Sequence, residues 1–202
     1  MGTIKKITKQ TNNRFLNMYA LDRVNKAGKE GVYYMASRAA DADHLKICTK
    51  AVTADAVIIY SILEDKVVLI RQYRYPLGGF IYEFPAGLVD PGESVTEAAI
   101  REMKEETGLT FKPISADNSY TKPYFTTIGM TDETNSMVYG YASGDITKRY
   151  QEENEEIEVV LADKAEVRRI LKEENSTIMC AYMLMHYLAD EEPFAFLEHA
   201  GL

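Results

Sequence analysis

Acidic side chains recur at helical spacing in the segment from Gly87 to Leu109, which reads GLVDPGESVTEAAIREMKEETGL. Residues three and four apart share one face of an α-helix, so Glu102, Glu105 and Glu106 are expected to cluster. Unpaired, such carboxylates repel one another, and a bound cation reverses the sign of that interaction. Mg²⁺ prefers carboxylate oxygens, keeps several waters and completes its coordination with substrate phosphates. The cluster therefore predicts a Mg²⁺ site, with Mn²⁺ as the alternative ion, that can capture a pyrophosphate.

A single arginine lies within this acidic cluster. Arg101 is expected to orient Glu105 or Glu93 rather than to bind substrate, because opposite charges at this spacing meet on one helix face. Arg101 and Glu105 are therefore candidate catalytic residues, and Glu105 is also a candidate metal ligand.

The same segment predicts its own helix. Ser94 starts a Ser-x-x-Glu capping box with Glu97, and Gly108 can adopt the left-handed conformation that ends a helix. The predicted helix spans 95–107. Its opposite face carries apolar residues at helical spacing, which predicts packing on a sheet. These residues are Val95, Ala98, Ala99 and Met103.

Beyond this helix, composition and periodicity predict further strands and helices. Phe15–Val24 and Gly31–Ala39 are expected to form an N-terminal hairpin. Later strands are expected at Ala56–Ser61, Lys66–Tyr73, Ser136–Ala142 and Ile157–Leu161, and helices at Lys164–Lys172 and Thr177–Leu188. These boundaries predict a small β element at residues 1–50 and one larger α/β domain at 51–202.

The spacing of glycine, glutamate and arginine in the acidic segment matches the Nudix box. The chain therefore resembles the Nudix hydrolases, which cleave nucleoside diphosphates linked to another moiety. The stretch RQYRYPLGGFIYEFPAGLVDPGE, from Arg71 to Glu93, is similar to the ADP-ribose pyrophosphatase branch, and so is TTIGMTDE at Thr126–Glu133. The resemblance implies an α/β fold: a Nudix α/β/α sandwich with a mixed sheet, preceded by a small antiparallel β element.

The resemblance also implies which residues bind metal and which accept a proton. The backbone carbonyl of Ala86 is expected to join the glutamates as a metal ligand. EENEEIEV, from Glu152 to Val159, resembles the mobile acidic loop that supplies the catalytic base in that branch. Glu153 is the first candidate for the base, although a solvated loop is the ordinary interpretation of so acidic a stretch. Glu155 is the second candidate, or an additional metal ligand, and Glu133 is the third.

Three residues before the box are candidates for substrate binding. Arg74 is expected to bind phosphate or to form a surface ion pair, and Arg71 is a further candidate of the same kind. Glu83, just before Phe84 and Pro85, is expected either to bind the nucleoside or to cap the end of its strand.

One position departs from the family pattern. Ile128 stands where many ADP-ribose-specific relatives carry proline before glycine. Proline fixes φ and stiffens a loop, so Ile128 leaves other sugar nucleotides open as substrates.

Charge and cysteine content limit the partners. The net charge of −8 argues against nucleic acid and anionic membranes. The only cysteines, Cys48 and Cys180, lack metal-ligand spacing and indicate free thiols in a reducing compartment. No apolar signal segment begins the chain, and a cytoplasmic protein is expected. The resemblance further implies a homodimer in which the N-terminal element helps form the partner's nucleoside pocket.

The combined expectation is metal-dependent hydrolysis of ADP-ribose or a similar nucleoside diphosphate sugar to a nucleoside monophosphate and a sugar phosphate. Two alternatives remain: a hydrolase for another nucleoside diphosphate derivative, and a nucleotide-binding regulator that keeps the fold without turnover.

Overall fold

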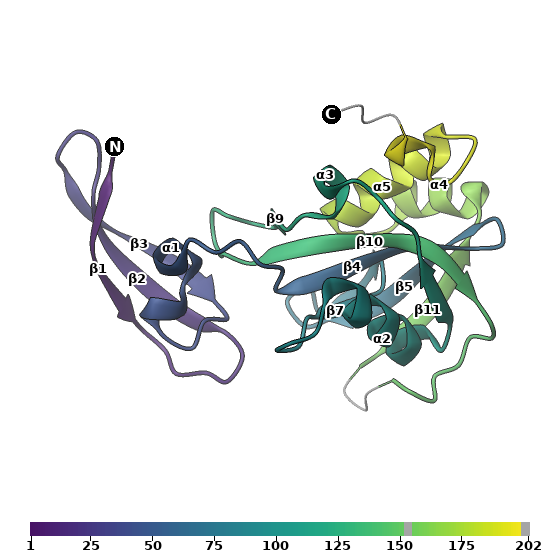
Figure 1. Ribbon diagram of the computed structural model, residues 1–202, viewed down its shortest axis with the longest axis horizontal. Helices are drawn as coiled ribbons and strands as arrows, with labels where there is room; N and C mark the ends of the chain where they lie inside the picture. Colours follow the sequence, from purple (N-terminus) through teal and green to yellow (C-terminus); the bar gives the residue numbers. More distant parts are fainter. Residues whose placement is uncertain (152–154, 199–202) are drawn as a thin grey trace. The chain divides into compact units, whose positions relative to one another are not determined.

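The computed structural model describes residues 1–151 and 155–198 and divides into two compact units. Unit 1 comprises residues 1–55 and 123–135, and unit 2 comprises residues 56–122 and 136–202. The division separates the N-terminal β element from the helices and strands around the acidic segment. Figure 1 shows the elements of each unit along the chain.

Unit 1 is built on a three-stranded antiparallel sheet in the order β1-β2-β3. Its elements are β1 (Thr3–Lys9), β2 (Asn17–Val24), β3 (Glu30–Ser37), η1 (Ala42–His44), α1 (Lys46–Thr49) and β9 (Tyr124–Phe125). The predicted hairpin is present, and the Gly28 amide donates to the Asn25 carbonyl in its turn. β1 was not predicted, since its polar, largely exposed sequence lacks an apolar face. Buried Tyr19, Leu21 and Leu45 form the core of this unit.

Unit 2 contains the large sheet, in the order β11-β5-β4-β10-β8, with β6 paired to β5 and β7 paired to β4. Its strands are β4 (Ala56–Leu63), β5 (Lys66–Arg74), β6 (Gly79–Glu83), β7 (Ala86–Leu88), β8 (Thr110–Pro113), β10 (Thr134–Ser143) and β11 (Ile157–Ala162). Its helices are α2 (Val95–Thr107), α3 (Asn118–Thr121), α4 (Lys164–Glu173), α5 (Ile178–Ala189) and η2 (Ala195–Leu197). The first two residues of β10 belong to unit 1.

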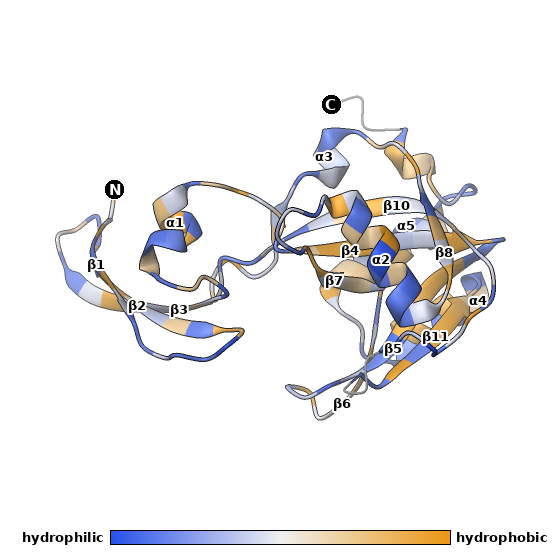
Figure 2. Ribbon diagram, turned by 60° about the horizontal axis from the view of Figure 1, so that its bottom comes forward, coloured by the Kyte–Doolittle hydropathy of each residue, from blue (hydrophilic) through white to orange (hydrophobic). Residues whose placement is uncertain are grey.

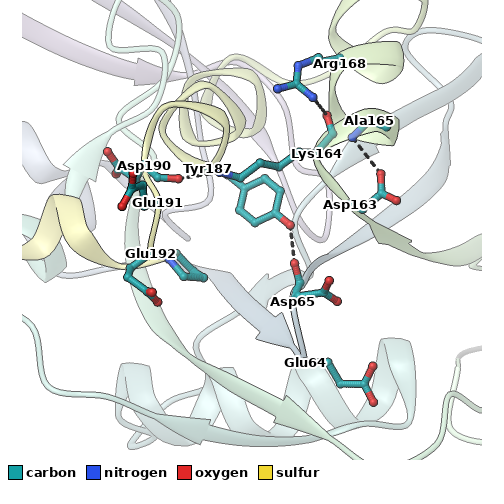
Figure 3. Close-up of a pocket in the computed structure, with 11 residues that line it drawn as sticks. Glu64, Asp65, Asp163, Lys164, Ala165, Arg168, Tyr187, Asp190, Glu191 and Glu192 are labelled. Atoms are coloured by element: carbon teal, nitrogen blue, oxygen red, sulfur yellow. Dashed lines mark hydrogen bonds between the residues drawn. The ribbon is translucent and has the colours of Figure 1, made fainter.

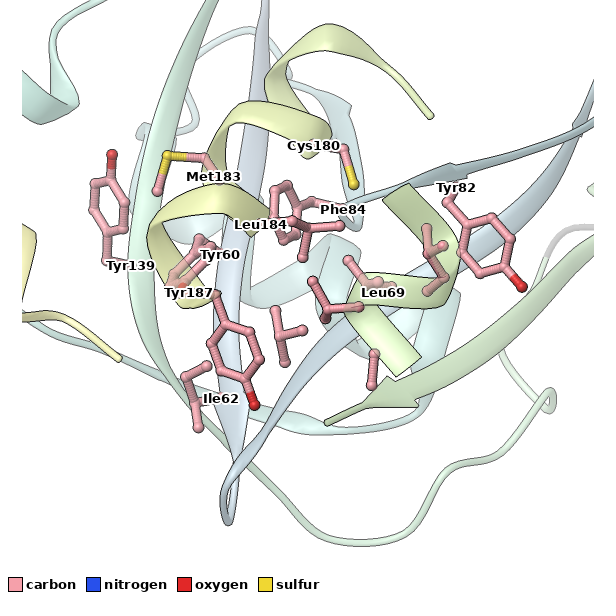
Figure 4. Packing of buried hydrophobic residues seen from close by; sticks show 14 of the residues in the cluster. Tyr60, Ile62, Leu69, Tyr82, Phe84, Tyr139, Cys180, Met183, Leu184 and Tyr187 are labelled. Carbon is pink, nitrogen blue, oxygen red and sulfur yellow. The ribbon is translucent and has the colours of Figure 1, made fainter. Parts of the chain in front are cut away.

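Alternation along β4 shows why this sheet is covered on both faces. Val57 and Ile59 pack with α2, whereas Tyr60 and Ile62 pack on the opposite side with α4 and α5. Figure 4 shows Tyr60, Ile62, Leu69 and Leu184 in the second of these clusters. The result is the predicted α/β/α sandwich with a mixed sheet and a separate antiparallel β element.

Helix α2 has the predicted boundaries and the predicted buried face. Ala98, Ala99 and Met103 are fully buried in the cluster beneath the helix, and Val95 is partly buried against it. Figure 2 shows hydrophilic and hydrophobic residues alternating along α2, as expected for a helix with one face on a sheet. Among the described residues, no helix is both long enough and apolar enough to cross a membrane.

Candidate functional site

Helix α2, which carries the candidate glutamates, is capped at both ends. The Ser94 hydroxyl accepts a hydrogen bond from the Glu97 amide at 3.2 Å, and the Ser94 amide donates to the Glu97 carboxylate at 2.9 Å. This is the predicted capping box. Gly108 ends the helix with φ of 80°, and its amide donates to the Lys104 carbonyl. The helix ends therefore set which side chains face β7.

β7 lies against the acidic face of α2. A Cβ atom on Gly87 would lie 1.9 Å from Cδ and Oε1 of Glu102, so any other residue there would displace the Glu102 carboxylate. The Ala86 amide donates a hydrogen bond of 3.0 Å to Oε2 of Glu106, whose side chain is 3% exposed. Two carboxylates of the helix are thus held against the β7 backbone.

Arg101 connects most of the remaining acidic side chains. It donates through Nε and Nη2 to both oxygens of Glu93, at 3.0 and 2.9 Å. Its Nη1 donates to Glu102 at 2.7 Å and to Glu105 at 3.0 Å. Nη2 also donates to the Leu88 carbonyl at 2.9 Å. Arg101 therefore orients both glutamates that the sequence suggested, and Glu102 as well.

The carboxylates differ in their electrostatic environment. Burial raises the pKa of Glu106 well above its ordinary value, and the charges of Glu102 and Glu155 add to this effect. Burial also raises the pKa of Glu102, against the opposing hydrogen bond from Arg101. Hydrogen bonds from Arg101 lower the pKa of Glu93. Negative charge is therefore under-compensated at Glu102 and Glu106.

These residues suit a divalent cation in the chemistry of their donor atoms. Carboxylate oxygens are the ligands preferred by Mg²⁺ and Mn²⁺, and excess buried negative charge favours a cation beside Glu102 and Glu106. The glycine at position 87 leaves room for the Glu102 carboxylate against the backbone of β7. No three His, Cys, Asp or Glu side chains among the described residues are already gathered as a metal centre. Glu105 instead points to Arg101 and is about half exposed.

The predicted phosphate-binding arginine is fixed by a neighbouring strand. Arg74, at the end of β5, donates from Nε and Nη2 to the two oxygens of Glu83 on β6, at 2.7 and 3.1 Å. Arg74 shares a face of β5 with Val68, which packs in the cluster beneath α2, so the pair lies on the α2 side of the sheet. Glu83 therefore orients Arg74, a role that the sequence did not suggest, and binding of the nucleoside by Glu83 stays a prediction.

Arg71 lies on the other face of β5. Its guanidinium stacks over the Phe80 ring at 4.2 Å and donates to Glu158 on β11 at 3.1 Å. The structure therefore does not bring Arg71 together with Arg74 or the α2 glutamates, and substrate binding by Arg71 stays a prediction.

The three candidates for the base stand differently. Glu153 lies outside the described residues. Glu155 is described, and its negative charge acts on Glu102 and Glu106. Glu133, in unit 1, accepts a hydrogen bond from Arg38 Nε at 2.9 Å. Among these candidates, Glu155 is the described residue with an electrostatic link to the α2 glutamates.

A cavity of about 610 Å³ lies elsewhere in unit 2 (Figure 3). Its lining includes Asp65, Asp163, Lys164 and Tyr187, and Tyr187 donates to the Asp65 carbonyl at 2.5 Å. None of the predicted site residues lines this cavity, so the acidic face of α2 remains the candidate site.

One buried polar residue near the site gave no signal in the sequence. Gln72 on β5 is 7% exposed, and its Oε1 has no hydrogen-bond partner among the described residues. Only the alternation of β5, once its register is known, places it on the face that α2 covers.

Comparison with known proteins supports this geometry. The chain is 33% identical over 101 residues to an ADP-ribose pyrophosphatase of Bacillus subtilis (strain 168), covering 48% of this chain and 51% of that protein. It is 47% identical over 72 residues to the ADP compounds hydrolase NudE of Escherichia coli (strain K12), covering 33% and 39%. The matches span only 27% to 56% of the length of the first curated relatives.

A solved structure and a family model extend the match. A crystal structure of an ADP compounds hydrolase superposes with a TM-score of 0.71 at 22% identity, covering 93% of this chain and 94% of the other. At this identity the likeness concerns the fold alone. The model of the NUDIX domain matches residues 52–182, well over half of the chain and including β5, β6, β7 and α2. The chain therefore belongs to the Nudix family, in which it resembles the ADP-ribose pyrophosphatases.

Proposed function

We propose that this protein hydrolyses the pyrophosphate bond of ADP-ribose or a similar nucleoside diphosphate sugar. The observation that carries the proposal is the pair of buried Glu106 and partly buried Glu102 held against β7, with Arg101 fixing the surrounding carboxylates. ADP-ribose pyrophosphatases and the ADP compounds hydrolase NudE among the relatives support the substrate class.

We further propose Mg²⁺ as the cofactor, with Mn²⁺ as a substitute, since members of the family generally use divalent metal ions. Glu102, Glu106 and the Ala86 carbonyl would hold it, and Glu105 is a further ligand candidate. When bound, the ion offsets charge on the pyrophosphate and lowers the pKa of a bound water.

Side chains of the protein bind the substrate phosphate and accept the proton of the attacking water. Arg74, held by Glu83, binds a phosphate of the substrate through its free guanidinium face. A glutamate of the acidic loop, Glu153 or Glu155, accepts the proton of the attacking water. The water oxygen bonds to one phosphorus as the bridging P–O bond breaks, giving nucleoside monophosphate and sugar phosphate. Arg101 keeps Glu102 in place throughout.

We also propose a homodimer in the cytoplasm, without nucleic acid or membrane as partners. Tyr34 and Val32 on β3 and Met18 on β2 are exposed apolar side chains on one face of the small sheet, and a second copy would cover them. Two free cysteines, Cys48 and Cys180, support a reducing compartment.

The proposed activity is tested by incubating the purified chain with ADP-ribose, ADP-glucose, diadenosine compounds and nucleoside triphosphates in H₂¹⁸O with Mg²⁺. Mass spectrometry of the products then identifies the substrate and the phosphorus that takes up ¹⁸O. We expect AMP and ribose phosphate from ADP-ribose, with one product labelled. Faster cleavage of a compound without a sugar would replace the substrate class, and no product from the whole panel would favour the regulator.

A further inference from the structure

Gln72 is a buried polar side chain that the proposed mechanism does not use. Its side chain is 7% exposed, yet Oε1 meets no donor among the described residues. Native proteins rarely leave a buried amide oxygen unpaired, because the desolvation of that atom is then uncompensated. Such an atom therefore needs a reason, either in packing or in a ligand.

The register of β5 places Gln72 on the same side of the sheet as the acidic face of α2. Val68, four residues earlier, packs in the cluster beneath α2, and side chains two and four apart share a face of a strand. Arg74, two residues later on that face, pairs with Glu83. Ile157 on β11 and Ile81 on β6 lie directly opposite Gln72, so neither directly opposed residue offers it a polar side chain.

The chemistry of Oε1 limits what can satisfy it. An amide oxygen only accepts hydrogen bonds, and so do fully ionised phosphate oxygens and carboxylates. Two acceptors cannot form a hydrogen bond with each other. Substrate phosphates and an ionised Glu106 therefore cannot pair with it. Water molecules on a hydrated divalent cation donate outward, and Mg²⁺ and Mn²⁺ keep several of them.

We propose that Gln72 is a positioning residue whose Oε1 accepts a hydrogen bond from a water on the divalent cation at Glu102 and Glu106. This inference rests on the proposed function, because it assumes the cation site described above. Groups that bind the outer face of a metal's ligands typically change metal affinity about 10–100-fold when removed. Gln72 thus tunes how tightly the site holds its ion.

Two measurements distinguish this role of Gln72 from a role in packing: the melting temperature without metal and the affinity for metal. Gln72→Met keeps the side-chain volume and removes the unpaired oxygen, and Gln72→Leu repeats the test with another apolar shape. Without metal, loss of the orphan oxygen should leave Tm unchanged or raise it by about 2–4 °C. With metal, loss of the acceptor should weaken binding.

Ser61 provides a matched control. It is fully buried on β4, and its Oγ also lacks a partner among the described residues. It lies next to Ile62, where β4 pairs with β5 beside the hairpin, whereas the site lies at the opposite end of β4, where Ile58 pairs with Ala86. Ser61→Ala therefore removes a buried orphan oxygen without reaching the cation site.

The experiment measures free Mn²⁺ by electron paramagnetic resonance during titration of full-length, metal-free protein, and Tm in EDTA. We expect the Kd for Mn²⁺ to rise about tenfold in Gln72→Met and Gln72→Leu and to stay at the wild-type value in Ser61→Ala. Wild-type Mn²⁺ affinity in both Gln72 variants, or weaker affinity accompanied by a lower Tm in EDTA, would overturn the inference. A wild-type chain that binds no Mn²⁺ would instead refute the proposed cation site itself.

Discussion

The carboxylate of Glu102 lies directly against the backbone of Gly87, so close that a side chain at that position would displace the carboxylate. A Cβ atom there would sit 1.9 Å from two atoms of the carboxylate, well inside van der Waals contact. The glycine on β7 therefore lets the carboxylate of one glutamate on α2 lie against the strand at the candidate site.

Replacing this glycine tests the relationship. Gly87→Ala should lower kcat/KM for ADP-ribose at least about 100-fold, because a displacement of the catalytic groups by about 1 Å has an effect of that size. Gly79→Ala on β6 is the control, since its Cβ would meet only Leu77 Cγ at 3.9 Å. Steady-state kinetics give kcat/KM for both variants. Equal values would show that activity does not depend on the position of the Glu102 carboxylate against Gly87.

The Arg74–Glu83 pair gives a prediction about substrate affinity. Arg74→Lys keeps the charge but removes the planar two-nitrogen contact, so KM should rise at least about tenfold with a smaller change in kcat. Arg169→Lys on α4 is the matched control, because Arg169 makes the same two-bond contact with Glu166, at 3.0 and 2.8 Å. An unchanged KM in Arg74→Lys would leave Arg74 as a surface ion pair.

The acidic loop gives a prediction about the chemical step. One of the variants Glu153→Gln and Glu155→Gln should lack the base. That variant should have a kcat lowered about 10²–10⁴-fold and a nearly unchanged KM, since a base acts in the transition state. Exposed Glu156→Gln is the control of equal charge change. The base would have to be sought elsewhere, with Glu133 next, if all three variants turn over like the wild type.

The proposed dimer can be disrupted by charge on the small sheet of unit 1. Tyr34 on β3 is 61% exposed, and Tyr34→Asp should give a monomer with a raised KM for ADP-ribose. Sedimentation equilibrium at micromolar concentration measures the assembly state, with Lys29→Asp in the hairpin turn as the control. A wild-type chain that is monomeric and fully active would contradict the dimer.

Local signals explain how much of the fold the sequence predicted. The bounds of α2 followed from Ser94, Glu97 and Gly108, because capping interactions act within one turn and can be identified from residue types. β6 and β7 were not predicted as separate strands, since they are short and Pro85 lies between them. β7 depends on pairing with β4, which is distant in sequence, whereas β6 forms a hairpin with the preceding strand β5.

The site was predictable in its residue types and less so in its contacts. Helical spacing grouped the glutamates of α2 and predicted the pairing of Arg101 with Glu105, but it did not show that Glu106 would face the Ala86 amide or that Glu102 would lie against Gly87. These contacts depend on where β7 meets α2. Gln72 was missed for the same reason, because its burial without a partner is set by three strands together.

The central claim is that buried Glu106 and partly buried Glu102 of α2 hold the ion that permits pyrophosphate cleavage. Turnover of ADP-ribose with Mg²⁺ by Glu106→Gln tests it most directly, alongside Tm in EDTA and Glu173→Gln on α4 as the charge-matched control. The claim predicts a loss of at least about 100-fold in kcat/KM for Glu106→Gln, with Tm in EDTA unchanged or higher because a buried charge is removed. Near-wild-type turnover by a folded Glu106→Gln protein would contradict it.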